Sequence, residues 1–307
     1  MPRFELNILG CGSATPTLRH QPACQVLNVR DNLMMIDCGE GAQLMLRKMR
    51  LKFSRLNHIF ISHLHGDHCF GLPGLLSTLA LHEKCGSVTI HVFDDGARWI
   101  DATLKQFCHE LPYEIRFNVI QKKSGIIYED DALTVKTFPL RHRVPAVGFI
   151  FAEKPKLRHI IPGAIDRYGI PHWQINAIKA GADYVTASGE TVENRLLTTD
   201  AEPAVSYAYC SDTMPSQRVV NAVKGVNWLY HEATYDDEMR HKARKRFHST
   251  AGEAATVAKE AGVGRLILGH FSKRYLTEDV LLEQARAIFP ATMLADEGLV
   301  IDLNKID

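Results

Sequence analysis

Apolar and polar positions along the first half of the chain follow two periods. Short apolar runs bounded by turn residues are typical of buried strands, and stretches with an apolar residue every three or four positions are typical of helices. The predicted strands are 4–10, 25–30, 33–37, 58–62, 88–93, YEIRFNVI, IIYED, LTVKTF and VGFIFAE. The predicted helices are 41–50, GLPGLLSTLALHE and 97–108.

The second half repeats this alternation of strand and helix. Strands are predicted at VSYAYCSD, WLYHEA and RLILGHF, with helices at about 217–224, 236–246, 249–261 and 277–288. Between the halves, about 154–194 has no clean period and carries Pro155, Pro162, Gly163, Gly169 and Pro171. The pattern predicts one α/β domain over 1–307, with buried strands under outer helices and an inserted arm at about 154–194.

Composition narrows the class of protein without identifying it. The 307 residues are 46% hydrophobic and 23% charged, which excludes disordered, collagenous and coiled-coil proteins. The longest nearly apolar stretch, 71–81, is too short to span a bilayer, so we expect no membrane partner. Seven scattered cysteines without a C-x-x-C pair indicate reduced thiols and a cytoplasmic protein. A net charge of +1 leaves any binding of nucleic acid to local patches.

The fifteen histidines prompt a search for metal ligands. In ISHLHGDHCFGLPG, four side chains of ligand type follow a predicted strand: His63, His65, Asp67 and His68. A lone histidine is usually a satisfied core residue. Four such groups crowded at a strand end would be costly to bury unless a cation satisfied them. Gly66 permits a tight turn, so residues on both sides of it can face adjacent metals.

The sequence HLHGDH resembles the H-x-H-x-D-H signature of the metallo-β-lactamase superfamily. Further segments resemble, in order and spacing, the motifs of short-form ribonuclease Z: GCGSATPT, DCGEGAQ, SDT, HEAT, HSTAGEAA and GHFSKRY. The resemblance implies an αββα sandwich of two mixed β-sheets with helices outside. It also implies an endoribonuclease that removes the 3′ trailer of precursor tRNA and leaves a 3′-hydroxyl on the tRNA.

The resemblance implies two Zn²⁺ per subunit. The ligands carried over are His63, His65 and His142 for one zinc, Asp67, His68 and His270 for the other, and Asp212 between them. Asp212 and His270 each follow a predicted strand, where α/β sheets place their sites. His142, in LRHRV, could equally lie in a solvated turn.

The implied reaction is hydrolysis of a phosphodiester by a metal-bound hydroxide. Asp67 is expected to act as general base. His248 and Glu232 are our candidates for protonating the leaving 3′ oxygen, because an alkoxide leaves poorly without a proton donor. The segment around His248-Ser249-Thr250 is also typical of a helix N-cap, and both roles can hold.

Several residues are candidates for binding the substrate. Those near the expected metals are Ser13, Thr15 and Arg274, and those at the root of the arm are Lys154, Lys156 and Arg158. A basic run at 240–246 precedes His248 and could position phosphates, although such a run is usually a solvated face. Asp37 is expected to support the site or the fold.

The arm departs from the family pattern, because YGIPHWQINAIKAGADYV lacks the glycine–proline pair expected after its lysine–glycine element. The resemblance nevertheless implies precursor tRNA as substrate and a homodimer in which the arm of one subunit serves the other.

Three other functions compete with this interpretation. A small-molecule phosphodiesterase or lactonase of the same fold would need the metals but not the arm. A flavin and di-iron oxidoreductase would have Glu in place of His65 and a flavin domain, and this chain has neither. A metal-free scaffold should have lost ligands, yet all seven positions are filled.

Overall fold

The computed structural model describes residues 3–82, 84–108, 110–121 and 124–305. Glu83, the last residue of the helix predicted from GLPGLLSTLALHE, lies outside the described residues. The chain forms two compact units: one contains residues up to Ala152 and from Val205 onward, and the other spans Glu153–Ala204. No helix in the described part is long and apolar enough to cross a membrane.

The first unit contains two seven-stranded mixed sheets. The first sheet has the order β18-β1-β2-β3-β4-β5-β6. Adjacent strands of this sheet are antiparallel from β18 to β3 and parallel from β3 to β6. The bounds are β1 Phe4–Gly10, β2 Cys24–Val29, β3 Asn32–Ile36, β4 Leu56–Phe60, β5 Ser87–Val92, β6 Glu114–Val119 and β18 Val300–Asp302.

The second sheet has the order β17-β16-β15-β14-β9-β8-β7. Strands β14 to β17 are parallel neighbours, whereas β9 pairs antiparallel with β14 and β7 antiparallel with β8. The bounds are β7 Gly125–Glu129, β8 Leu133–Pro139, β9 Val147–Glu153, β14 Ser206–Cys210, β15 Trp228–Glu232, β16 Arg265–Gly269 and β17 Thr292–Leu294.

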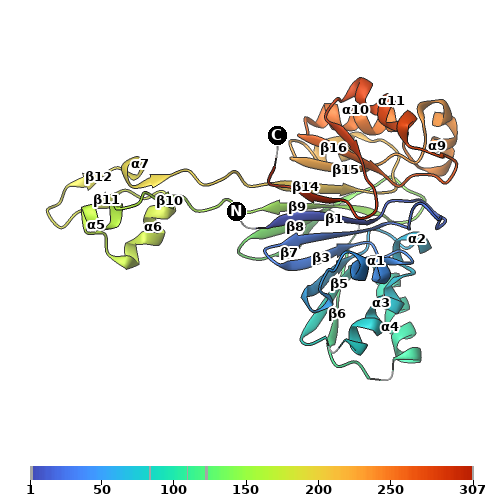
Figure 1. Cartoon of the computed structure of the whole chain (residues 1–307), viewed down its shortest axis with the longest axis horizontal. Helices are drawn as coiled ribbons and strands as arrows, with labels where there is room; N and C mark the ends of the chain where they lie inside the picture. Colours follow the sequence, from blue (N-terminus) through green and yellow to red (C-terminus); the bar gives the residue numbers. More distant parts are fainter. Residues whose placement is uncertain (1–2, 83, 109, 122–123, 306–307) are drawn as a thin grey trace. The chain divides into compact units, whose positions relative to one another are not determined.

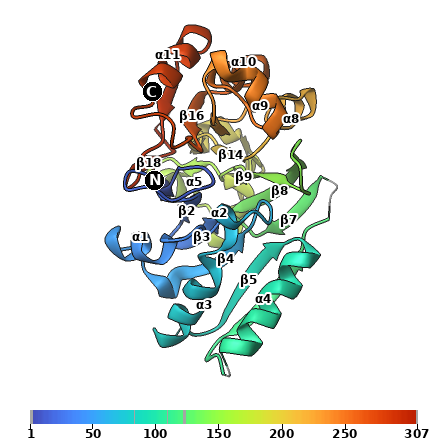
Figure 2. The same ribbon diagram turned by 90° about the vertical axis from the view of Figure 1, so that its right-hand side faces the viewer.

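Helices lie on the outer face of each sheet (Figures 1 and 2). The first sheet is covered by α1 Ala42–Lys48, α3 Leu72–Leu81 and α4 Asp94–Phe107, with η1 Phe53–Arg55 and α2 Gly66–Cys69 in the loops. The second is covered by α8 Gln217–Ala222, α10 Ala251–Ala261 and α11 Asp279–Ile288. This arrangement is the predicted αββα sandwich.

The alternating period of the strands builds the layers. On β1, Phe4, Leu6 and Ile8 join the core between the two sheets, whereas Leu9 faces the helices outside the first sheet. Residues two apart point to the same face of a strand, so each strand can serve two cores. The outer core contains Leu75 of α3, which closes the layer.

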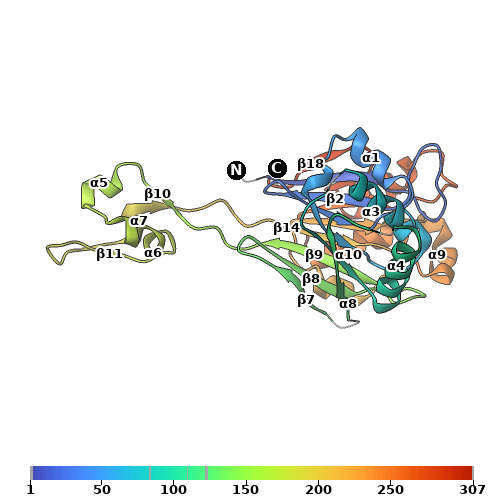
Figure 3. The same cartoon turned by 90° about the horizontal axis from the view of Figure 1, so that it is seen from below.

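The second unit is built from short elements around a core of its own (Figure 3). Its elements are β10 His159–Ile160, α5 Ala164–Tyr168, η2 His172–Gln174, α6 Ile175–Lys179, β11 Tyr184–Val185, β12 Thr191–Val192, α7 Asn194–Leu197 and β13 Thr198–Thr199. Strand β10 pairs with β13 and β11 with β12. Elements of two to five residues are too short to show a period, which explains the missing pattern in the sequence.

Two other details differ from the sequence-based prediction. The helix predicted at 236–246 is divided into η3 Asp237–Met239 and α9 Arg240–Arg246. The strands β17 and β18 were not predicted, because three residues are too few to show alternation.

Candidate metal centre

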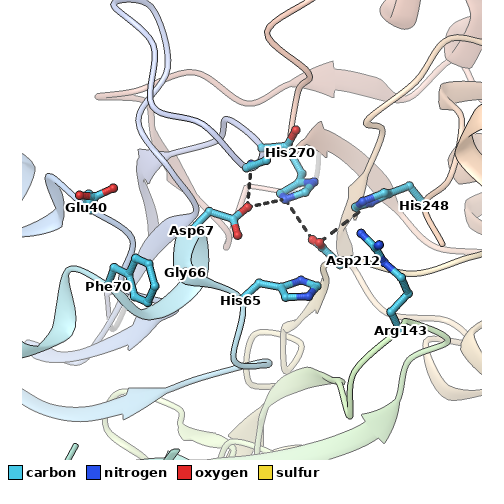
Figure 4. Close-up of a pocket in the computed structure, with 11 residues that line it drawn as sticks. Glu40, His65, Gly66, Asp67, Phe70, Arg143, Asp212, His248 and His270 are labelled. Atoms are coloured by element: carbon cyan, nitrogen blue, oxygen red, sulfur yellow. Dashed lines mark hydrogen bonds and ion pairs between the residues drawn. The ribbon is translucent and has the colours of Figure 1, made fainter. Parts of the chain in front are cut away.

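The seven predicted ligands cluster at one place in the first unit. Four of them, His65, Asp67, Asp212 and His270, line a pocket there (Figure 4). The seven ligands come from the segments that follow β4, β8, β14 and β16. The pocket has a volume of about 420 Å³. Its lining comprises Ser13, Ala14, Glu40, His65, Gly66, Asp67, Phe70, Arg143, Asp212, His248 and His270. Both sheets therefore contribute residues to the site.

One group of ligand atoms is formed by three histidines. Nδ1 of His65 lies 3.1 Å from Nε2 of His63 and 3.1 Å from Nε2 of His142. Burial lowers the pKa of all three rings, so they are neutral at neutral pH and can offer lone pairs to a cation. The structure thus removes the solvated-turn alternative for His142, whose side chain is part of the cluster.

A second group is formed by Asp67, His68 and His270. Oδ2 of Asp67 lies 3.6 Å from Nε2 of His68 and 3.5 Å from Nε2 of His270. Burial alone would raise the pKa of Asp67, but the neighbouring His68 and His270 lower it, so the carboxylate is ionised.

Asp212 faces both groups. Its Oδ1 lies 3.3 Å from Nε2 of His68 and 3.0 Å from Nε2 of His270, whereas its Oδ2 lies 3.7 Å from Nε2 of His63 and 3.6 Å from Nε2 of His142. One carboxylate thus presents a separate oxygen to each set of ligands.

The donor set fits a pair of divalent cations. Nε2 of His68 and Nε2 of His270 are buried and lack a hydrogen-bond partner. A buried polar atom without a partner is costly, and these two atoms face Asp212 in the cluster. Imidazole nitrogens and carboxylate oxygens are the ligands that zinc accepts in a tetrahedral site.

Outer partners fix the orientation of the rings. Nδ1 of His68 lies 2.7 Å from Oδ2 of Asp37, and Nδ1 of His270 lies 2.9 Å from Oγ1 of Thr234. A hydrogen bond to the second ring nitrogen of a histidine directs its other nitrogen toward the metal. The opposite nitrogens of these two histidines are the unpartnered Nε2 atoms.

Asp37 is the centre of a buried hydrogen-bond network. Besides His68, it accepts hydrogen bonds from the backbone N–H and the hydroxyl of Ser62 at 2.7 and 2.8 Å, and from the hydroxyl of Tyr209 at 2.8 Å. Tyr209 belongs to β14 and Asp37 follows β3. The network therefore joins the two sheets directly behind the metal ligands, in the supporting role expected of Asp37.

His248 and Glu232 form a pair beside the cluster. Nδ1 of His248 lies 2.9 Å from Oε1 of Glu232. Burial by itself lowers the pKa of His248, but Glu232 more than offsets this and raises it to about 9. Conversely, burial would raise the pKa of Glu232, and His248 lowers it. The pair is an imidazolium and a carboxylate at neutral pH.

The segment after His248 also begins a helix, as predicted. Thr250 is the N-cap of α10, and its side chain forms a capping box with Glu253. Ser249 donates a hydrogen bond to the carbonyl oxygen of Thr213 at 2.7 Å. The helix cap and the position of His248 at the pocket are therefore compatible.

The predicted substrate-binding residues are distributed unevenly. Ser13 lines the pocket, and the backbone N–H of Ala14 donates to Oδ2 of Asp67 at 2.7 Å. Thr15 and Arg274 are outside the pocket lining, and the guanidinium of Arg274 lies 4.7 Å from the centre of the Tyr235 ring.

The three basic residues of the arm belong to the second unit, Lys154, Lys156 and Arg158. Lys156 forms an ion pair with Glu153 at 2.9 Å, and Arg158 forms one with Asp200. These contacts within the arm partly neutralise two of the cations that were expected to meet tRNA.

Four pocket residues were not site candidates in the sequence: Ala14, Glu40, Phe70 and Arg143. Arg143 adjoins the ligand His142, and that adjacency could have identified it. The expected role of Gly66 also needs revision, because its backbone φ is not positive. A Cβ on Gly66 would lie 2.4 Å from Cε2 of Phe70, so the glycine makes room for that ring.

Comparison with known proteins identifies relatives of this chain. Residues 4–156 match the family model described as anti-Pycsar protein Apyc1. The ribonuclease Z of Bacteroides fragilis is 51% identical over 304 residues, covering 99% of this chain and 100% of that protein.

Two solved structures are similar to the structure of this chain. The short form of human tRNase Z has a TM-score of 0.70 and 27% identity, covering 97% of this chain and 99% of its own. The metallo-beta-lactamase fold protein YhfI from Bacillus subtilis has a TM-score of 0.69 at 15% identity, covering 98% and 99%, and shows the fold alone. Because the 51% identity to the ribonuclease Z of Bacteroides fragilis extends over 99% of the chain, this protein belongs to the ribonuclease Z family.

Proposed function

We propose that the chain is a zinc-dependent endoribonuclease that removes the 3′ trailer of precursor tRNA and leaves a 3′-hydroxyl on the tRNA. The observation that carries this proposal is the position of Asp212, which presents one oxygen to each of two ligand groups. Membership of the ribonuclease Z family supplies the class of substrate.

Two zinc ions are proposed for each subunit. His63, His65 and His142 would hold one, Asp67, His68 and His270 the other, and Asp212 would contact both. When bound, the ions supply Lewis acidity, which lowers the pKa of water and stabilises negative charge on a phosphate oxygen. The protein's contribution is to place the phosphodiester against this pair of sites.

Asp67 is the proposed general base. Its Oδ2 accepts a hydrogen bond from the N–H of Ala14 and faces His270. Within the described part of the chain, Oδ1 has no hydrogen-bond partner and can accept the proton of the attacking water. Because the pKa of Asp67 is lowered, the carboxylate is in the form that accepts a proton.

His248 is the proposed general acid, and Glu232 positions it. The hydrogen bond from Nδ1 of His248 to Glu232 leaves Nε2 for the substrate, and His248 lines the pocket. A proton delivered from Nε2 to the leaving 3′ oxygen would release the tRNA with a free 3′-hydroxyl, while the phosphate stays on the trailer.

Basic surfaces would hold the rest of the tRNA. Helix α9 has an exposed basic run and ends next to Phe247, whose carbonyl oxygen lies 3.1 Å from Nδ1 of His142. Phosphates bound along this helix would be close to the metal ligands. We further propose that the arm, Glu153–Ala204, is a separate tRNA-binding element.

We also propose a homodimer in which the arm of one subunit serves the other, as the family resemblance implies. A cytoplasmic setting is supported by the seven scattered cysteines, which include no C-x-x-C pair. Sedimentation of the purified protein at several concentrations tests the oligomeric state, and a monomer at all concentrations would contradict the dimer.

The direct test is gel analysis of purified protein with a 3′-extended precursor tRNA, with and without a chelator. We expect one cut that leaves a 3′-hydroxyl on the tRNA, loss of cleavage with the chelator, and recovery with Zn²⁺. Asp67→Ala should abolish cleavage while the far-ultraviolet circular dichroism is unchanged. The matched control is Asp101→Ala, which removes a half-exposed carboxylate of α4.

A second substrate distinguishes the proposed endoribonuclease from a small-molecule phosphodiesterase. Bis(p-nitrophenyl) phosphate needs the metals but no tRNA contact. Hydrolysis of this diester without any cleavage of precursor tRNA would favour a small-molecule phosphodiesterase. Undiminished cleavage by Asp67→Ala would contradict the proposed mechanism.

A further inference from the structure

Phe70 places an exposed aromatic ring in the pocket of the metal centre (Figure 4). Phe70 is 61% exposed, although it follows the buried candidate ligand His68 by only two residues. A single exposed apolar residue is ordinary on a protein surface. A ring exposed inside this pocket is different, because it offers an aromatic face to a ligand that fills the pocket.

The ring is held in place from two directions. A Cβ on Gly66 would lie 2.4 Å from Cε2 and 2.7 Å from Cδ2 of Phe70, so the ring packs directly over the glycine backbone. The ring of Trp99, on α4, lies 6.4 Å away between centroids, at an interplanar angle of 52°. Phe70 is thus supported by its neighbours while much of its surface remains open.

The charges around the pocket differ between its two sides. Glu40 lies on the side of Phe70, whereas Arg143 and His248 lie across the ligands from them (Figure 4). A phosphate is attracted to the side with the cations and repelled by the carboxylate of Glu40. The side formed by Phe70 and Glu40 therefore suits an uncharged, flat group, and a nucleobase is such a group.

We propose that Phe70 stacks on the base of the first trailer nucleotide, the one directly 3′ of the cut. This inference rests on the proposed function, because the direction of the strand follows from the role of His248. His248 protonates the 3′ oxygen of the last tRNA nucleotide, so that nucleotide lies on its side of the ligands. The strand then crosses the metal sites and continues over Phe70.

Such a contact explains how one pocket can process different trailers. Every base has a flat face, so stacking holds the nucleotide with little dependence on its identity. The stacking also requires that the first trailer nucleotide be unpaired, because a base within a duplex is covered on both faces.

The test compares two forms of one precursor tRNA, the normal form and a form with an abasic first trailer nucleotide. On the normal form, Phe70→Ala should lower kcat/KM about 10-fold, mainly through KM, which is the size expected for base stacking. Phe70→Leu should lower kcat/KM by the same factor, since it keeps an apolar side chain over Gly66 but has no aromatic face. Phe70→Trp should retain activity.

On the abasic form, wild type and Phe70→Ala should be equal, because there is no base to stack. The matched control is Phe107→Ala. It removes another exposed ring, 78% exposed and outside the pocket lining, and should leave kcat/KM unchanged on both substrates. Zinc content and elution volume in gel filtration should match those of wild type for all variants.

Three results would overturn the inference. Equal kcat/KM for wild type and Phe70→Ala on the normal precursor would show that the ring does not bind the trailer. An equal loss on the normal and abasic forms, or a changed oligomeric state, would assign Phe70 to the fold or to a subunit contact. Absence of any cleavage by wild type would instead contradict the proposed function itself.

Discussion

Oε1 of Glu232 lies 2.9 Å from Nδ1 of His248, and the same carboxylate group accepts hydrogen bonds from the backbone N–H of Thr213 at 2.9 Å and the hydroxyl of Thr234 at 2.6 Å. Glu232 is fully buried, and its environment is filled with donors. It therefore holds the His248 ring in one orientation, with Nε2 available to the pocket.

His248→Ala should slow the cleavage of precursor tRNA about 10²- to 10⁴-fold, the usual contribution of a general acid. A substrate in which sulfur replaces the 3′ bridging oxygen should restore much of the rate, because a thiolate leaves without a proton. Single-turnover kinetics on both substrates measure this. An equal defect on the sulfur substrate would mean that His248 acts in another way.

Asp37→Asn should weaken zinc binding at the site of His68. The amide retains the size of the carboxylate, but it loses the charge that orients the His68 ring, and such outer partners typically affect metal affinity 10- to 100-fold. Competition with a chromogenic chelator measures the affinity. Asp101→Asn is the matched control and should leave the affinity unchanged.

The loop before β2 should show a dependence of stability on pH. Burial lowers the pKa of His20, but hydrogen bonds to Glu278 and Glu297 more than offset this and raise it to about 9. A raised pKa stabilises the folded state fully below the unfolded value of about 6.5, and the effect is lost as the pH rises through about 9.

Urea unfolding at pH 6, 8 and 10 measures this dependence. The difference in the free energy of unfolding between wild type and His20→Gln should be largest at pH 6 and should shrink toward pH 10. His82→Gln, at the C-terminal end of α3, is the control. A difference that does not change with pH would contradict the charge pairing of His20.

The arm should be removable as a unit. Ala152 on β9 pairs with Ser206 on β14, so a short glycine-containing turn can join the two strands after Glu153–Ala204 is deleted. We expect the variant to hydrolyse bis(p-nitrophenyl) phosphate at nearly the wild-type rate and to lose at least about 10-fold in kcat/KM on precursor tRNA, because it lacks phosphate contacts. Equal losses on both substrates would argue against a tRNA-binding role of the arm.

The clustering of the candidate ligands could be predicted in large part because most of them follow strand ends. His63 and His270 follow apolar runs whose period is clear in the sequence, and parallel strands bring their carboxyl ends to one edge. His142 had no such context, since LRHRV resembles an ordinary turn. Only the folded chain shows that its Nε2 lies 3.1 Å from Nδ1 of His65.

Other features depend on contacts between distant segments. The packing of Phe70 over Gly66 involves a side chain four residues away, but its support by Trp99 comes from a different helix. The left-handed backbone of Phe247, with φ of 62°, ends α9 where a glycine would be expected. No pattern of polar and apolar positions predicts either feature.

The division of the ligands between the two sheets has a consequence for folding. His63 and His68 follow the first sheet and Asp212 and His270 follow the second, so each metal ion would cross-link halves of the sandwich that are far apart in the chain. A metal that binds only the folded state stabilises that state by its free energy of binding. Bound zinc would therefore stabilise the contact between the two sheets. Chelation should therefore loosen the sandwich along the seam between the sheets before the helices on its outer faces are lost.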